Sequence, residues 1–223
     1  MRNDIEKGDI EITRRLDIDD RVFETTKRQA FVTVKDHKEN FRTNPKCRLL
    51  NPTKPELGKI SKKLTEHINT VVREKTGFNQ WKNTKSTTTW YTNQKQKHKL
   101  KFIQADIDGM YGSITEELLD KAIEWAKQYV EISDSDKYII FQAKKSVIYH
   151  KNAPWKKKGV TNFDVTVGSY DGAETCNLIG LYLLSQLQDL GLDIGVYRDD
   201  ILALSKFSAQ KTEQIKKQIC EIF

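Results

Sequence analysis

The sequence predicts an α+β fold, in which helices and short strands follow one another without a regular repeat. Apolar residues recur at helical spacing in several segments, for example at Ile60, Leu64 and Ile68. Shorter apolar runs have the length of strands and occupy residues 100–105, 195–197 and 201–204. Because these segments do not form consecutive strand–helix–strand units, the pattern favours α+β over a parallel α/β sheet.

The first predicted elements are a charged arm and a hairpin. Residues 1–27 are rich in charge and poor in apolar periodicity, so we expect them to form an N-terminal arm. A β-prone run at residues 31–34 and a second around residues 48–50 flank a polar stretch. This arrangement is typical of a long hairpin with a basic, polar tip.

Helical segments follow. Ile60, Leu64 and Ile68 continue to Val71 and Val72 as one amphipathic helix. Ser113 and Glu116 have the spacing of a capping box ahead of a second helix. Ser133 is expected to cap a third helix, which carries Ile139, Ile140, Ala143 and Val147. Residues 173–190 are strongly apolar and predict a core helix.

Composition narrows the class of partner. The chain has 223 residues, with 38 basic and 31 acidic side chains and a formal net charge of +7, which favours a polyanionic partner, a nucleic acid first and an anionic membrane second. The longest apolar run, residues 178–184, is far shorter than a membrane span, and the charged N-terminus does not resemble a secretory signal. We therefore expect a soluble protein of the cytoplasm or nucleus, with no membrane partner. Three distant cysteines predict neither a zinc site nor disulfides.

Two segments place carboxylates at strand ends. Asp199 and Asp200 stand at a tight turn between two apolar strands, and Asp106 ends the strand predicted at residues 100–105. If these strands are neighbours, Asp106 and Asp199 converge, and their repulsion is relieved by cations. Hard oxygen ligands suit two magnesium ions, with manganese as the alternative. The pattern therefore indicates metal-assisted phosphoryl transfer.

These segments resemble the motifs of reverse transcriptases. Asp106 with Tyr111 five residues later is similar to motif A, and the run Tyr197-Arg198-Asp199-Asp200 is similar to the Tyr-x-Asp-Asp box of motif C. Between them, residues 168–178 resemble motif B, although Tyr170-Asp171 stands where the family usually has Pro-Gln. The order and spacing of the three segments agree with the family, and the resemblance covers about residues 28–220.

The resemblance implies roles for individual residues. Asp106, Asp199 and Asp200 would be catalytic, and these three carboxylates with the Ile107 carbonyl would hold the metal ions. Tyr111 would exclude a ribose 2′-hydroxyl. The remaining residues of the implied nucleotide site are Lys35 (or Lys38), Arg48, Asp171 and Gly172. The substrates would be an RNA template, a DNA primer and deoxynucleoside triphosphates; the sequence indicates no protein partner.

The resemblance also implies an architecture, a right-hand polymerase with an antiparallel palm sheet backed by helices. Residues 28–223 would form the reverse transcriptase domain, with fingers at 28–99 and 115–160, a palm at 100–114 and 161–223, and no thumb. The implied activity is RNA-directed DNA synthesis of the retroelement type. The alternative is a degenerate or domesticated fragment that binds RNA without polymerising, since motif B is altered and the thumb is missing.

Other segments suit contacts with nucleic acid. Residues 81–101 hold six lysines and no acid together with Trp81, an arrangement that suits phosphate contacts and base stacking. The predicted contacts are Trp81, Lys95, Lys97, Tyr197 and Arg198. The competing interpretation of this segment is a solvated loop anchored by its aromatic residues.

Two further hypotheses remain for the function of the whole chain. The first is a palm enzyme that makes RNA, against which Tyr111 favours deoxynucleotides. The second is a basic RNA-binding module whose acidic residues are incidental.

Overall fold

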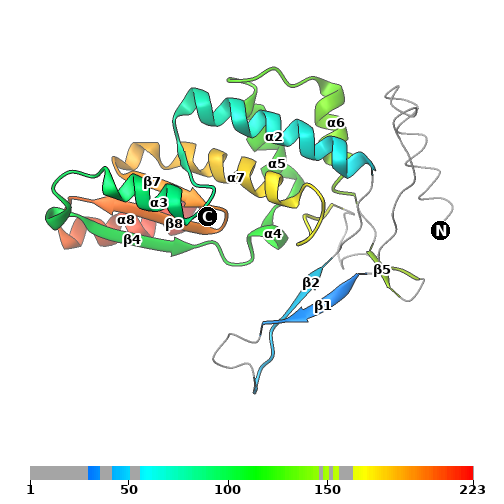
Figure 1. Cartoon of the computed structure of the whole chain (residues 1–223), viewed down its shortest axis with the longest axis horizontal. Helices are drawn as coiled ribbons and strands as arrows, with labels where there is room; N and C mark the ends of the chain where they lie inside the picture. The colour runs from blue at the N-terminus through cyan, green and yellow to red at the C-terminus, as the bar shows by residue number, and fades with distance from the viewer. Residues whose placement is uncertain are drawn as a thin grey trace.

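The computed structural model describes residues 30–35, 42–50, 56–145, 148–150, 153–155 and 163–222. Within these ranges the chain is α+β, with seven α-helices, a four-stranded mixed sheet and two small hairpins (Figure 1). The α+β class predicted from the sequence is confirmed. The expected arm at residues 1–27 and Lys38 lie outside the described residues.

The central sheet has the strand order β3-β7-β8-β4. Its strands are β3 (Asn79–Gln80), β4 (Lys101–Asp106), β7 (Asp193–Tyr197) and β8 (Asp200–Ser205). The three predicted strands pair antiparallel with one another, β7 with β8 and β8 with β4, as expected. The sheet as a whole is mixed rather than antiparallel, because β3 pairs in parallel with β7. A strand of two residues is too short to show a period-2 pattern, so the sequence did not predict it.

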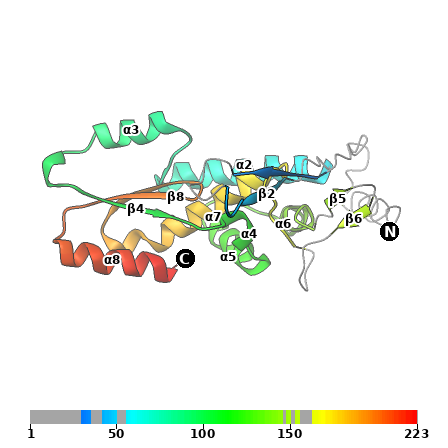
Figure 2. The ribbon, with the colours of Figure 1, turned by 90° about the horizontal axis from the view of Figure 1, so that it is seen from below.

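Helices cover both faces of this sheet, as Figure 2 shows. On one face, Ile201 and Ala203 of β8 pack with residues of α7 (Gly172–Gln186) and α8 (Ala209–Ile222). On the other face, Leu202 and Leu204 lie with Trp81 and with Trp90 of α3 (Thr84–Thr92). The alternation along β8 explains why a strand with no polar interior residue fits between two helical layers.

Three of the remaining helices pack against α7, namely α2 (Glu56–Thr76), α4 (Met110–Ser113) and α5 (Glu116–Ala126), and α6 (Asp134–Gln142) packs against α2. Apolar side chains of α2, α5 and α7, among them Val72, Ile123 and Leu178, share one buried cluster. None of the helices in the described ranges is long and apolar enough to cross a membrane.

The helix boundaries correct two predictions and confirm others. Ser133 caps α6, as predicted, and forms a capping box with Asp136. The cap of α5 is Thr115, whose side chain accepts a hydrogen bond from the Leu118 backbone, rather than the predicted Ser113. Helix α3 was not predicted, because Trp90 is its one buried residue and its threonine-rich sequence carries no apolar period. The core helix predicted at residues 173–190 ends at Gln186, and a 3-10 turn (Gln188–Leu190) follows it.

Two hairpins complete the described structure. Strands β1 (Phe31–Val34) and β2 (Cys47–Leu50) pair antiparallel, so the predicted hairpin is confirmed. Figure 1 shows this hairpin extending away from the helices and the sheet. Its strands carry exposed apolar side chains, with Val32 57% and Phe31 49% exposed. Strands β5 (Ile148–His150) and β6 (Ala153–Trp155) form the second hairpin.

Gly195 in β7 allows Trp81 to lie directly on the sheet. A Cβ at this position would come within 2.4 Å of Trp81 Cζ2 and 2.6 Å of the Asn79 carbonyl oxygen. Because the backbone must shift to make room, we expect Gly195→Ala to lower the free energy of unfolding by about 1–3 kcal/mol. Urea denaturation of the variant measures this loss. Gly112→Ala is the matched control, since a Cβ there meets nothing within 4 Å, and an equal loss in both variants would contradict the explanation.

Candidate active site

The Tyr197–Asp200 segment forms a two-residue turn between β7 and β8. Tyr197 and Asp200 are paired across the hairpin, so Arg198 and Asp199 occupy the turn. Arg198 adopts a left-handed backbone with φ of 56°, a conformation that costs a non-glycine residue energy. Its guanidinium lies 5.5 Å from the centre of the Tyr197 ring. Buried Val196 and Ile201 hold the strands on either side, so the two aspartates are fixed at the end of the sheet.

Asp106 lies at the same end of the sheet. In the register of β4 and β8 it stands directly opposite Asp200. One residue later, the Ile107 amide donates a hydrogen bond of 2.9 Å to the Asp199 carbonyl oxygen. The strands β4 and β8 are thus neighbours, which was the condition for convergence, and the chain positions of Asp106, Asp199 and Asp200 lie at one end of the sheet.

Tyr111 and Gly172 join this end of the sheet from α4 and α7. A Cβ on Gly172 would lie 3.3 Å from Tyr111 Cε1, so the glycine lets the tyrosine ring approach the start of α7. Burial, followed by the neighbouring Cys176 thiol, raises the pKa of Tyr111 to about 12, and the charges of Arg198 and Asp199 also act on it. The phenol is thus neutral at physiological pH. Residues from all three predicted motifs meet here.

Asp171 occupies a different place from the one expected. Its carboxylate accepts hydrogen bonds from the Lys144 ammonium and the Ser61 hydroxyl, and all three residues are almost fully buried. The side chain therefore points into the interior beneath α7, and it does not line the predicted nucleotide site in this structure. The sequence did not predict that Lys144 pairs with Asp171, because the two residues are 27 positions apart and Lys144 lies in a segment rich in other lysines.

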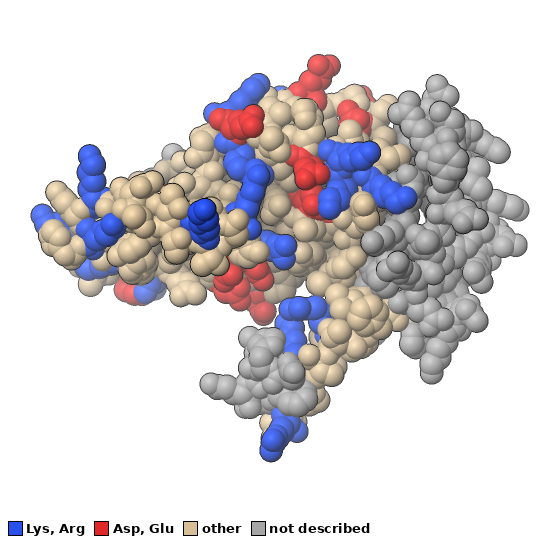
Figure 3. Space-filling model, viewed as in Figure 1, with Lys and Arg blue, Asp and Glu red and all other residues tan. Residues whose placement is uncertain are grey.

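Lys35 and Arg48 are on the β1–β2 hairpin, apart from the carboxylates. Arg48 is exposed on β2, and the Lys35 amide bonds to the Lys46 carbonyl at the hairpin end. Within the described residues no hydrogen bond or ion pair joins this hairpin to the end of the sheet. The charged side chains that the structure describes on the hairpin are all basic, as Figure 3 shows for the face in view. Their role in triphosphate binding stays a prediction.

The residues predicted to contact nucleic acid divide into two groups. Lys95, Lys97 and Arg198 are exposed, and Tyr197 is partly exposed beside the turn. Trp81 is only 7% exposed, and its ring lies 4.9 Å from that of Trp90. Because its faces are covered by protein, Trp81 is an anchor for α3 and not an open platform for base stacking. The phosphate contacts predicted for Lys95 and Lys97 stay a prediction, and residues 84–92 form helix α3 rather than part of a solvated loop.

The comparisons with known proteins do not assign this chain to a family. No protein-family model matches the chain, and no curated protein matches it. The resemblance to reverse transcriptases therefore depends on the motifs themselves and on the geometry described above.

Whether this site can bind metal ions depends on the oxygen ligands that its residues provide. In the part of the chain that the structure describes, no three His, Cys, Asp or Glu side chains are grouped so that they alone could hold a metal. Magnesium, however, usually takes one or two carboxylates from the protein and completes its shell with water and substrate phosphates. The resemblance assigns such a partial ligand set to Asp106, Asp199 and the Ile107 carbonyl, and this assignment stays a prediction.

Asp200 shows the electrostatic cost of this arrangement. Burial, and then the charges of Asp199 and Asp106, raise the pKa of its carboxyl above the usual 3.8. The folded state thus holds the proton more tightly than the unfolded state, so stability falls as the pH rises through this raised pKa. At pH 7 without divalent ions, we expect Asp200→Asn to raise the midpoint of thermal unfolding by about one or two degrees.

Calorimetry at two pH values checks this expectation. The difference between the variant and the parent should shrink as the pH is lowered toward the ordinary pKa of aspartate, since both side chains are then neutral. An unchanged or lower midpoint for Asp200→Asn at pH 7 would show that the three carboxylates do not repel one another in the folded chain.

Proposed function

We propose that this chain is the fingers and palm of an RNA-directed DNA polymerase. It would add deoxynucleotides to the 3′ end of a DNA primer on an RNA template. The observation that supports this most directly is the pairing of Asp106 with Asp200 across β4 and β8, with Asp199 held beside Ile107. This arrangement joins the two aspartate-bearing segments that resemble motifs A and C.

In the proposed mechanism, the protein positions ions and substrates. Asp106, Asp199 and the Ile107 carbonyl would hold two magnesium ions, and Asp200 would support them. When bound, such ions stabilise the attacking and leaving oxygens of an in-line phosphoryl displacement. The rigid sheet fixes the carboxylates before substrate arrives, which reduces the reorganisation needed in the reaction. Lys35 and Arg48 on the hairpin would neutralise the triphosphate.

Primer extension tests the proposal. The purified chain is incubated with an RNA template, an annealed DNA primer and deoxynucleotides, with magnesium or manganese. Extension that requires the ion and is lost in Asp199→Asn would support a working polymerase site. Binding of the duplex without any extension, and without a dependence on magnesium, would support a fragment that lacks catalytic activity.

Tyr111 offers a test of sugar selection. Its ring lies against Gly172, near Asp199, where the resemblance places the group that excludes a 2′-hydroxyl. Removing the ring opens this space, so we expect Tyr111→Ala to raise the efficiency of ribonucleotide incorporation relative to deoxynucleotides by at least about tenfold. Tyr111→Phe is the control, because it keeps the ring and should keep the selectivity. Equal selectivity in all three proteins would remove Tyr111 from this role.

A second candidate function is supported by the altered motif B. Asp171 is held inside by Lys144 and Ser61, so a residue that resembles part of the nucleotide site has a structural partner instead. This favours a domesticated fragment that binds RNA and does not polymerise. The two candidates differ in one measurement, since only the polymerase incorporates deoxynucleotides in an Asp199-dependent manner.

A further inference from the structure

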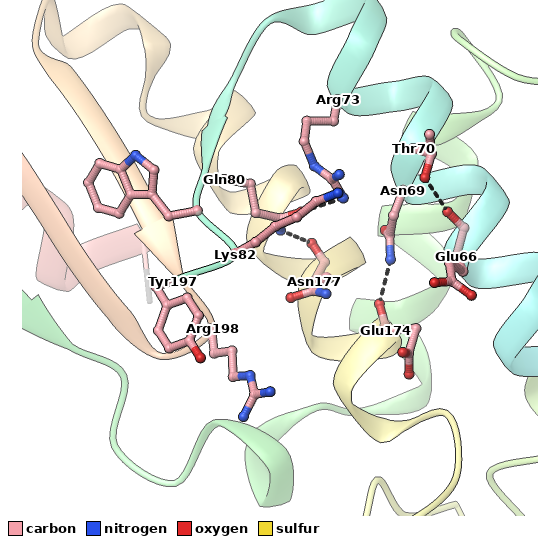
Figure 4. Close-up of a pocket in the computed structure, with 11 residues that line it drawn as sticks. Glu66, Asn69, Thr70, Arg73, Gln80, Lys82, Glu174, Asn177, Tyr197 and Arg198 are labelled. Carbon is pink, nitrogen blue, oxygen red and sulfur yellow. Dashed lines mark hydrogen bonds between the residues drawn. The ribbon is translucent and has the colours of Figure 1, made fainter. Parts of the chain in front are cut away.

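A polar cavity lies beside the candidate active site, on the other side of the Tyr197–Arg198 turn from α4. It has a volume of about 230 Å³ and is formed by α2, β3, the start of α7 and the turn itself. Figure 4 shows its lining side chains, among them Asn69 and Arg73 from α2 and Glu174 from α7. The proposed catalytic mechanism makes no use of this cavity.

Three residues that line the cavity from α2 and α7 have a buried polar atom without a protein partner among the described residues. One of these atoms is a donor, Arg73 Nε, and two are acceptors, Asn69 Oδ1 and Glu174 Oε2. Asn69 is only 2% exposed. Because a buried donor or acceptor that is left unsatisfied destabilises the fold, three such atoms around one cavity are a costly arrangement for a purely structural surface.

The same side chains are held in place by their other polar atoms. Asn69 Nδ2 donates to the Glu174 carbonyl at 2.8 Å, as the dashed line in Figure 4 shows. Lys62 Nζ lies 3.3 Å from Glu174 Oε1, and Arg73 Nη2 lies 3.4 Å from Gln80 Oε1. In Asn69, Glu174 and Arg73, one polar atom thus contacts another residue, and a second polar atom is uncommitted, which means that it has no hydrogen-bond partner among the described residues. The cavity is therefore ordered before any ligand is present.

The mixture of uncommitted atoms limits the chemistry of a ligand. A phosphate would satisfy Arg73 but would be repelled by Glu174. A metal cation would satisfy Asn69 and Glu174 but would be repelled by Arg73. A nucleobase carries donors and acceptors side by side on its edge, so it can satisfy both kinds of atom.

We propose that this cavity binds an unpaired nucleobase of the template strand, close to the point of synthesis. The base must be unpaired, because pairing would occupy the edge that the cavity recognises. The exposed cations Lys82 and Arg198 at the rim suit the adjoining phosphates. This inference depends on the proposed function, since it assigns a template contact to the same protein.

The test is an equilibrium binding experiment without catalysis. Fluorescence anisotropy measures the affinity of the full chain for a primer–template duplex with an RNA overhang, in a buffer with a chelator and no deoxynucleotides. A series of templates carries one abasic site at successive positions of the overhang. Because a hydrogen bond to a charged group contributes about 1.5–3 kcal/mol, we expect one abasic position to weaken binding by about tenfold or more.

Variants connect that position to the cavity. Glu174→Gln and Arg73→Lys should each weaken binding of the intact template to a similar degree, with no further loss on the sensitive abasic template. Glu117→Gln is the matched control, because it also removes a lysine salt bridge but its side chain is exposed on α5, and it should bind like the parent.

The outcomes separate this inference from the proposed function. Tight binding that is equal for all abasic templates would overturn the nucleobase site and leave the proposed polymerase function intact. The same conclusion would follow if Glu174→Gln and Arg73→Lys weakened binding equally on every template. Failure of the parent chain to bind any duplex would overturn both proposals.

Discussion

Primer extension by Asp106→Asn is expected to be at least about a thousandfold slower than by the parent chain, because an amide cannot provide the charged metal ligand that the proposed mechanism needs. Asp106 ends β4 directly opposite Asp200, so the substitution changes one ligand atom and leaves the strand pairing in place. The rate is measured as single-nucleotide extension under saturating magnesium. Duplex affinity should change little, since the loss acts on the chemical step.

Asp108→Asn is the matched control for this experiment. Asp108 is exposed two residues beyond Asp106 and follows the end of the strand. Because its side chain is exposed to solvent, its substitution should leave the rate within about twofold of the parent. Equal losses in both variants would indicate a general electrostatic effect and not a metal ligand at Asp106. Unchanged extension by Asp106→Asn would overturn the proposed mechanism.

The sequence predicted the end of the sheet because its signal is local. A strand, a tight turn with two acids and a second strand occupy residues 195–204 without interruption, and the apolar alternation places the sheet between two layers. The position of Asp106 required only that β4 be the neighbour of β8. The hairpin at β1 and β2 was predictable for the same reason, since both strands and the intervening polar stretch are adjacent in the chain.

The features that the sequence did not predict depend on contacts between distant residues. Asp171 looks like part of a substrate loop until Ser61, 110 residues away, and Lys144 are found beside it. Trp81 looks like an exposed aromatic among lysines until Gly195 and Trp90 are found to cover its ring. The uncommitted atoms of the cavity have no local signature either, because each residue forms an ordinary hydrogen bond with its other polar atom. Such residues need the tertiary structure before their roles can be argued.

The buried pair of Lys144 and Asp171 should be the most sensitive point for stability. Burial lowers the pKa of Lys144, and the charge of the adjacent Asp171 carboxylate opposes this shift, so the buried pair carries a desolvation cost that each partner offsets for the other. Removing the cation leaves the carboxylate buried with only the Ser61 hydroxyl as a side-chain donor. We expect Lys144→Met to lower the free energy of unfolding by about 3–5 kcal/mol, measured by urea denaturation.

The double variant distinguishes a charge effect from a packing effect. Lys144→Met with Asp171→Asn removes both charges and keeps an amide that can accept the hydrogen bond from Ser61, so it should recover most of the stability lost in the single variant. If the double variant is as unstable as Lys144→Met alone, the loss comes from the packing of the lysine side chain. Recovery would show instead that the loss in the single variant comes from the unpaired charge of Asp171, which lies at the start of α7 and next to Gly172. Position 171 would then contribute to the proposed nucleotide site by fixing the helix on which Gly172 meets Tyr111.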